Sequence, residues 1–201
     1  WFMMHKIRKA MGNRDALYKL TDIVEFDEGC FETETDKATR TSLKRGRGSE
    51  RQVNVAVMAE STPLEEIATG KKSNHCRYFK MRVLESYLKD EINQVIKDNI
   101  AEKTIVFSDK STSYVDISEF VEVHITEKSS EETTMTTLRW VHIAISNAKR
   151  TLLGIYHKVK GKYLQLYLDE FCYKLNRRYF GERLFDRLII AVSNNYWYKN
   201  G

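Results

Sequence analysis

The sequence of 201 residues has no long apolar run and only one proline. Its apolar stretches are short, as in Leu188–Val192, whereas a membrane-spanning helix needs about 20 consecutive apolar residues. Charged residues (Lys6, Arg8 and Lys9) stand close to the N-terminus, which argues against a secretory signal. We therefore expect neither a leader nor a membrane partner.

Cysteine is scarce, and its spacing excludes two kinds of site. Cys30, Cys76 and Cys172 are far apart and odd in number, and no C-x-x-C pair occurs. A closed zinc site and a disulfide framework are both disfavoured by this pattern. We predict three reduced thiols in a cytoplasmic protein.

Hydrophobic residues make up 42% of the chain and charged residues 30%, which is the balance of one folded domain. The net charge is +5, and it is unevenly distributed. From Lys149 to the C-terminus there are eleven Lys and Arg against four acidic residues. This excess predicts that one face of the C-terminal part meets a polyanion.

The order of apolar patterns predicts an α/β fold. Three strands come first, followed by a helix, a strand, a short helix and a further strand, and then by helices. This order fits a ribonuclease H-like mixed five-stranded sheet flanked by helices, with a helical C-terminal segment. The predicted helices are 4–19, 85–99, 138–156, 162–179 and 182–196, the predicted strands 21–27, 52–59, 77–84, 104–108 and 120–125, and the predicted loops 28–51, 60–75 and 126–137.

The first residue is Trp1 rather than Met. We therefore expect a further region of the protein upstream of Trp1. Residues 1–20 would be a helical lead-in that ends this region, and residues 21–201 would form the main domain.

Two aspartates follow apolar strands. Asp27 ends the predicted strand 21–27, and Asp109 follows the predicted strand 104–108. These strands are neighbours in a sheet of this order, so the carboxylates would meet at one edge. Two close carboxylates repel unless a cation lies between them, and Mg²⁺ favours such oxygen ligands. Alternatively, each Asp only terminates a strand or caps a helix; Glu25 points the same way as Asp27.

A histidine and a lysine lie on one face of the predicted helix 138–156. His142 is near its start, and Lys149 follows two helical turns later. A lone histidine on a helix is usually structural or exposed, and the pattern around Lys149 fits a solvated side chain equally well. If the two aspartates bind metal, His142 is a candidate third ligand, and Lys149 a candidate contact for a phosphate.

The C-terminal block from Gly154 to Leu188 combines apolar and basic residues. Its stripe of Leu, Tyr and Phe at helical spacing predicts core packing rather than a surface for stacking bases. Arg177 and Arg178 end a predicted helix, where cations suit the helix dipole and are placed to contact DNA backbone.

Over nearly all of residues 1–190 the chain resembles the ISXO-like transposases, a branch of the DDE superfamily of bacterial insertion-sequence enzymes. The resemblance rests on six blocks, of which the last, following the others in order, is the most specific. They are VEFDEG at 24–29, RGRGS at 45–49, FSDKSTSY at 107–114, WVHIAISNAKR at 140–150, GIYH at 154–157 and YLDEFCYKLNRR at 167–178.

The resemblance implies a catalytic and metal-binding set of Asp27, Asp109 and His142. In the superfamily the third member is a glutamate followed seven residues later by Lys or Arg, and an ungapped alignment puts His142 and Lys149 at these positions. Asn147 is the competing candidate if the alignment carries a gap. An imidazole binds Mg²⁺ more weakly than a carboxylate does, so the site would hold its second ion loosely or favour Mn²⁺.

The implied reaction is phosphoryl transfer with two Mg²⁺ or Mn²⁺ ions, which cleaves DNA strands at the element ends and joins them to target DNA. Asp27 would bridge the ions, with Asp109 on one and His142 on the other. The expected DNA contacts are Lys149, Arg150, Arg177 and Arg178. Self-association on DNA is expected by analogy, as is a DNA-binding segment upstream. The alternatives are a ribonuclease H-like nuclease without strand transfer and an inactive DNA-binding remnant.

Overall fold

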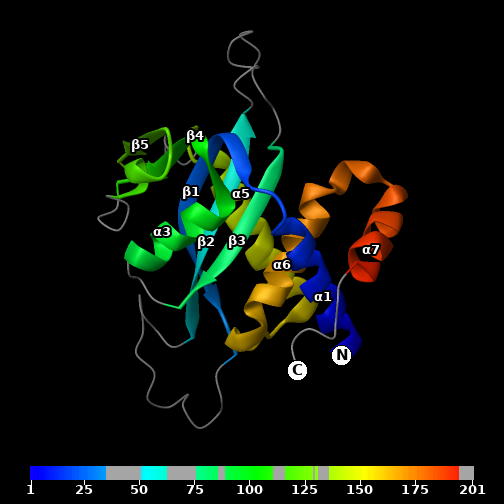
Figure 1. The fold of residues 1–201 in the computed structure, drawn as a ribbon. Helices are drawn as coiled ribbons and strands as arrows, with labels where there is room; N and C mark the ends of the chain where they lie inside the picture. The colour runs from blue at the N-terminus through cyan, green and yellow to red at the C-terminus, as the bar shows by residue number, and fades with distance from the viewer. Residues whose placement is uncertain are drawn as a thin grey trace.

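The computed structural model describes residues 1–34, 51–62, 76–85, 89–110, 116–128, 130 and 136–194. Its centre is a five-stranded sheet with the strand order β3-β2-β1-β4-β5 (Figure 1). The first three strands form an antiparallel meander, and β4 and β5 run parallel to β1. The predicted fold class, a mixed five-stranded sheet flanked by helices, is confirmed. The strands are β1 (Leu20–Glu32), β2 (Gln52–Thr62), β3 (Tyr78–Leu84), β4 (Ile100–Asp109) and β5 (Val123–Glu127).

The structure corrects the end of the first strand. We predicted that β1 stops at Asp27, but it runs to Glu32, so Asp27 lies inside the strand. The reason is its pairing with β2, which continues to the pair Glu32 with Gln52 and satisfies the backbone whatever the side chains are. The predicted loop 28–51 therefore starts later than expected, and its RGRGS block lies outside the described residues.

Other strand bounds also differ from the prediction. β2 extends to Thr62 and β4 begins at Ile100, because backbone pairing carries both strands into polar sequence. β5 covers Val123–Glu127 rather than 120–125, and the short turn Ile117–Glu119 precedes it as a 3-10 helix.

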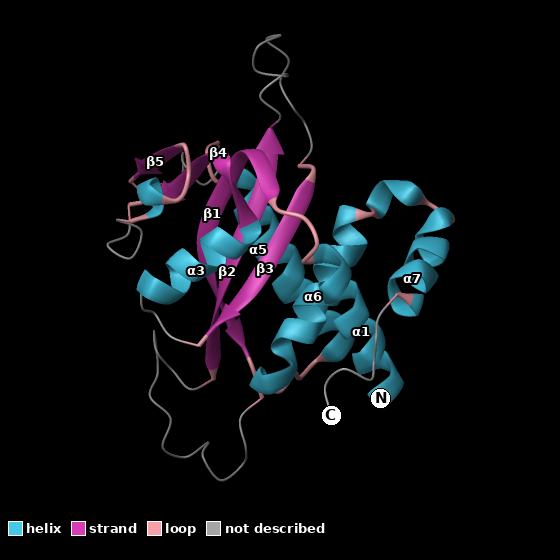
Figure 2. Cartoon of the chain, viewed as in Figure 1, coloured by secondary structure: helices cyan, strands magenta, loops and turns pink. Residues whose placement is uncertain are grey.

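Helices cover the two faces of the sheet unequally (Figure 2). Helix α3 (Lys89–Asn99) packs on one face, over a core that includes Val24, Phe26 and Val106. Helices α5 (Arg139–Thr151) and α6 (Leu164–Asn176) pack on the other, over a core that includes Val55 and Val57. Of the stripe of α6 predicted to be core, Leu164 and Leu168 are buried there, and the other members are partly buried against the same core, namely Tyr167, Phe171 and Leu175.

The predicted helix 138–156 changes its winding near its end. After α5 the chain forms a π-helical turn, Leu152–Tyr156, and His157 then takes a positive φ of 57°. A π-helical turn adds a residue to the helical repeat, a change that the apolar pattern does not reveal.

Two further helices pack outside α6. Helix α1 (Phe2–Asp15) contacts both α6 and α7 (Arg183–Ser193). A Cβ at Gly12 would lie 2.3 Å from Oδ2 of Asp169, so a larger residue would require the Asp169 side chain or α1 to shift. The division of the chain near residue 20 stays a prediction.

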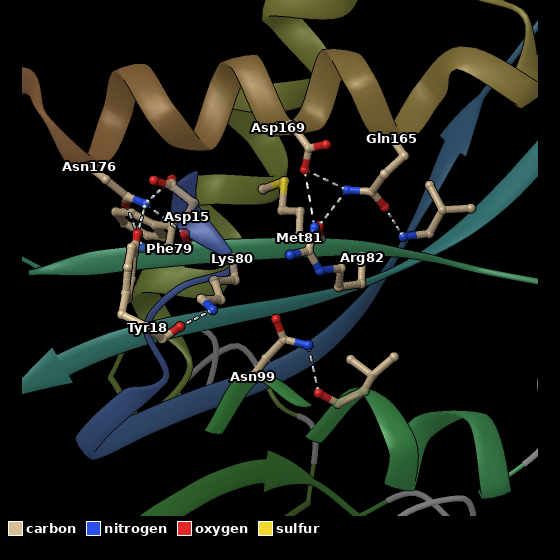
Figure 3. Close-up of polar contacts among 12 residues, drawn as sticks. Asp15, Tyr18, Phe79, Lys80, Met81, Arg82, Asn99, Gln165, Asp169 and Asn176 are labelled. Atoms are coloured by element: carbon tan, nitrogen blue, oxygen red, sulfur yellow. Dashed lines mark hydrogen bonds and ion pairs between the residues drawn. The ribbon is translucent and has the colours of Figure 1, made fainter. Parts of the chain in front are cut away.

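Helix α6 also covers the edge of the sheet, because two of its amide side chains bind the outer backbone groups of β3 (Figure 3). Gln165 accepts from the N–H of Val83 at 2.8 Å and donates to the carbonyl of Met81 at 3.0 Å. Asn176 accepts from the N–H of Phe79 at 2.7 Å and donates to its carbonyl at 2.9 Å. The edge is thereby closed to pairing with another strand.

All three cysteines are free thiols, as predicted, with Cys76 and Cys172 buried. In the described part of the chain no helix is both long and apolar enough to cross a membrane.

Candidate catalytic centre

Asp27 and Asp109 come from neighbouring parallel strands. The last register pair of β1 with β4 is Phe26 with Ser108, and each aspartate is the next residue of its strand. Side chains alternate along a strand, so both aspartates share a face with Phe107 and Gly29, the face that α5 covers. The expected meeting of these two strands is thus observed, with Asp109 ending β4.

His142 approaches Asp27 from above the sheet. Its Nε2 atom lies 3.6 Å from Oδ2 of Asp27, and the two side chains are 35% and 15% exposed. Asn147, the competing candidate, is exposed on α5. Five residues turn a helix by about 140°, so His142 and Asn147 point in different directions. The geometry therefore favours His142 as the partner of the aspartates.

A buried glutamate sets the position of α5. No side chain at its N-cap residue, Leu138, binds the helix terminus. Instead the carboxylate of Glu25 accepts from the N–H groups of Trp140 at 2.7 Å and Val141 at 3.1 Å. Glu25 is 3% exposed and lies two residues before Asp27 on β1. Sequence reasoning noted its direction but missed this role, since its partners are more than a hundred residues away.

Gly29 lets α5 lie close to the strand. A Cβ at this position would be 3.3 Å from the side chain of Ile145 and 3.1 Å from that of Phe31. Both distances are tighter than ordinary van der Waals contact, so a larger residue would push the helix outward. Gly29 thus allows α5, the helix that carries His142, to lie close to β1, and Glu25 anchors the start of this helix.

Burial raises the pKa of the Asp27 carboxyl to about 6, and the negative charges of Asp109 and Glu28 act in the same direction. The N–H of Glu28, which donates to Oδ1 of Asp27 at 2.8 Å, opposes the rise. Asp27 is thus an electrostatically unfavourable anion that a nearby cation would stabilise.

The other two groups of the centre are also perturbed. Burial lowers the pKa of His142, against the charge of Asp109, so its imidazole is neutral near pH 7 and keeps a lone pair for a metal ion. Burial raises the pKa of Glu25 to about 8, although the N–H groups of Val141 and Trp140 favour its charged form.

The centre is not a closed cluster of ligands. Across the described residues, no group of three His, Cys, Asp or Glu is near enough to hold a metal ion. The chemistry of the donors nevertheless suits a hard divalent cation, because two carboxylates share one face and the charge of one raises the pKa of the other. One imidazole completes a set of donors that Mn²⁺ also accepts.

A serine and a histidine support the end of β4. The hydroxyl of Ser108 donates to the carbonyl of Asp109 at 3.0 Å and lies 2.8 Å from Nε2 of His124 on β5. Because the hydroxyl has one proton, it accepts from His124 when it donates to Asp109. Sequence reasoning missed this pair, which joins β4 and β5 beside the candidate ligand.

The predicted DNA contacts divide into two groups. Lys149 and Arg150 are exposed on α5, and Nζ of Lys149 lies 5.6 Å from the ring centroid of Phe31. Arg177 instead pairs with Asp15 at 2.7 Å, and Arg178 donates to backbone carbonyls. Lys149 is on the same helix as His142, seven residues further along. The two arginines instead connect the end of α6 to Asp15 and to the backbone of Cys76. A role of any of the four in binding DNA stays a prediction.

Comparison with known proteins gives one family. The family model of the ISXO2-like transposase domain matches residues 19–176. The comparison with curated proteins found no match.

Among solved structures the chain is remotely similar to complexes of the Mos1 transposase. For a Mos1 mariner paired-end complex with Mn, the identity is 14% and the TM-score 0.37, over 97% of this chain. For a pre-cleavage Mos1 transpososome, the values are 9% and 0.32, over 96% of this chain. The chain spans 63% of the length of each of these solved chains.

Proposed function

Because the chain belongs to the ISXO2-like transposase domain family, we propose that it is a DNA transposase that cleaves strands at the ends of a bacterial insertion sequence and transfers them to target DNA. The observation that carries the proposal is that His142 lies 3.6 Å from Asp27, on the strand next to the one that Asp109 ends. Family membership supports the class of enzyme, and this arrangement supports the choice of residues.

The metal-binding residues would be Asp27, Asp109 and His142. The metal would be Mg²⁺ or Mn²⁺, with two ions expected by analogy to the family. When bound, such ions activate an attacking hydroxyl and stabilise the leaving oxygen of a phosphodiester. The neutral His142 would bind through a ring nitrogen. Asp27 must lose its proton first, and its raised pKa makes this a step that depends on pH.

The substrate backbone would lie along α5. Lys149 is two helical turns from His142 on the same face and is exposed, so it can neutralise a phosphate next to the one that reacts. Arg150 adds a second charge beside it. Joining two element ends requires two copies of the catalytic centre, so we propose that the protein self-associates on DNA.

The test is a pair of assays with the 201-residue chain. Cleavage and joining of labelled element-end DNA are measured with Mg²⁺ and Mn²⁺ for the wild type and for Asp109→Asn, with Asp186→Asn on α7 as the matched control. We expect metal-dependent cleavage and joined products that only Asp109→Asn abolishes.

Two other results would replace the proposal. Cleavage without joined products would favour a ribonuclease H-like nuclease. DNA affinity without Mn²⁺ binding, measured by calorimetry, would favour an inactive remnant.

A further inference from the structure

A groove lies at the end of the sheet where β1 begins. It has a volume of about 900 Å³ and is bordered by α1, α6, α7 and the ends of three strands. Its lining is rich in cations and aromatic rings and contains a single carboxylate, Glu60, which pairs with Arg77 at 3.1 Å. The cations of the lining are Arg14, Lys19, Arg77, Arg177 and Arg187.

Two of the four arginines have no acidic partner in the described chain. Arg77 pairs with Asp22 and Glu60, and Arg177 pairs with Asp15. Arg14 on α1 and Arg187 on α7 form no ion pair with any described residue. The guanidinium of Arg187 lies over the ring of Phe180, 5.5 Å from its centroid. Two arginines from different helices thus keep their charge available at one groove.

A buried hydroxyl lies among these charges. Tyr173 lines the groove and is 1% exposed, and its hydroxyl has no hydrogen-bond partner within the described residues. Burial and the negative charge of Asp15 raise the pKa of this hydroxyl, while the charges of Arg177, Arg14 and Arg187 oppose the rise. Leaving a buried hydroxyl unpaired costs about 1–3 kcal/mol, which an incoming acceptor would remove.

Hydrogen bonds and an ion pair connect the residues at the floor of the groove. Asn176 donates to the hydroxyl of Tyr18 at 2.9 Å and to Asp15 at 3.1 Å, and it binds both backbone groups of Phe79 (Figure 3). Asp15 in turn holds Arg177, whose guanidinium stacks 3.7 Å from the ring centroid of Tyr173. The hydroxyl of Tyr173 is therefore held in place before any ligand arrives.

We propose that this groove is a second DNA-binding site, in which Arg14, Arg187 and the Tyr173 hydroxyl bind a phosphate of the DNA backbone. A hydroxyl donor and two guanidiniums lining one groove match a phosphate, which offers acceptor oxygens and a negative charge. The rings of Tyr179 and Phe180, exposed by 67% and 37%, border the same groove and offer apolar contact to the sugar.

The groove is separate from the candidate catalytic centre. Thr21 lines the groove, and Asp27 lies six residues further along β1, which is about 20 Å in an extended strand. One phosphate cannot contact both places. The inference extends the proposed function, since it takes DNA as the substrate, but it assigns a different surface of the protein.

The test measures DNA affinity without divalent metal, so that it does not depend on catalysis. Binding of a 30-base-pair duplex of arbitrary sequence is followed by fluorescence anisotropy over a range of salt concentrations. For the double variant Arg14→Ala/Arg187→Ala we expect at least a threefold loss of affinity. The slope of log affinity against log salt concentration should also become smaller by about 0.9, which corresponds to about one phosphate contact. Tyr173→Phe keeps the ring but removes the hydroxyl. We expect it to lower the affinity for DNA and to leave the salt dependence of binding unchanged.

The matched control is Lys9→Ala/Arg183→Ala. It removes two exposed charges from the same two helices, α1 and α7, outside the groove. Equal losses in both double variants would show only a general effect of charge and would overturn the proposal, as would unchanged affinity in the groove variant. Loss of affinity in the groove variant together with absent cleavage by the wild type would leave this site standing and reject the catalytic proposal.

Discussion

The carboxylate of Glu25 accepts a 2.7 Å hydrogen bond from the backbone N–H of Trp140, at the start of α5. Strand β1 therefore carries both Asp27 and the group that anchors the helix of His142. The two candidate ligands belong to elements far apart in sequence, yet one buried side chain of β1 anchors the helix that carries the second of them. Any change at Glu25 should act on the catalytic centre through His142.

Replacing Glu25 tests this coupling. Glu25→Ala leaves two N–H groups of α5 without an acceptor and should cost about 1–3 kcal/mol of stability and about 10–100-fold of activity. Glu25→Gln keeps an acceptor oxygen and should recover much of both. The measurements are thermal unfolding and DNA cleavage per folded molecule. Full activity of folded Glu25→Ala would show that the glutamate does not position His142.

Removing the charge of Asp27 should stabilise the metal-free protein. The folded protein holds a proton on Asp27 up to about pH 6, whereas the unfolded chain releases it near 3.8. The contribution of Asp27 to the free energy of unfolding is therefore fully present below pH 3.8 and is lost as the pH rises through 6. The loss is at most about 3 kcal/mol, so Asp27→Asn should be more stable by about 1–3 kcal/mol at pH 7–8.

Denaturant unfolding at several pH values measures this difference. It should vanish near pH 4, where Asp27 is protonated and neutral like asparagine. Asp186→Asn, on the exposed surface of α7, serves as the control for removing a carboxylate. A variant less stable than the wild type at pH 8 would contradict the assignment of Asp27 as a buried, destabilising anion.

Metal affinity should follow the same ionisation. Because a carboxylate must be deprotonated to bind, the affinity for Mn²⁺ should fall at least about tenfold per pH unit below about 6, with a further loss where His142 is protonated, and level off at higher pH. Titration calorimetry from pH 5 to 8 provides the curve. A constant affinity across that range would mean that Asp27 does not bind the ion.

The amide of Asn176 should be important for stability rather than for chemistry. It binds Phe79, Asp15 and Tyr18 at once, so Asn176→Ala leaves several buried polar groups unpaired. We expect a loss of about 2–4 kcal/mol, with a smaller loss for the less buried Gln165→Ala. Chemical denaturation gives both values, and a neutral Asn176→Ala would show that α6 does not depend on this contact to cover β3.

The sequence predicted the parts of the site that follow from strand order. Asp109 follows an apolar strand, and its neighbour in the sheet carries Asp27, so their approach could be anticipated from topology. The end of β1 could not, because backbone pairing with β2 carries that strand through Glu28 and Glu32. Glu25 gave no local signal, since a cap supplied by another element leaves no pattern near the helix it caps.

The same limit applies to the basic C-terminal segment. Its charge predicted a polyanion, but not which arginines are available. Arg177 and Arg178 stood out in the sequence, yet the structure engages them with Asp15 and with backbone carbonyls. In the sequence nothing distinguishes Arg14 and Arg187 from other charged residues. Only the packing of α1 and α7 places them at one groove.

The central claim is that Asp27, Asp109 and His142 form one metal centre. A crystal of the 201-residue chain soaked in Mn²⁺, with an anomalous difference map recorded at the manganese edge, tests it most directly. The account predicts a peak bounded by the two carboxylates and the imidazole, and its absence from a matched Asp109→Asn crystal. Manganese bound elsewhere, with no peak between Asp27 and Asp109, would contradict it.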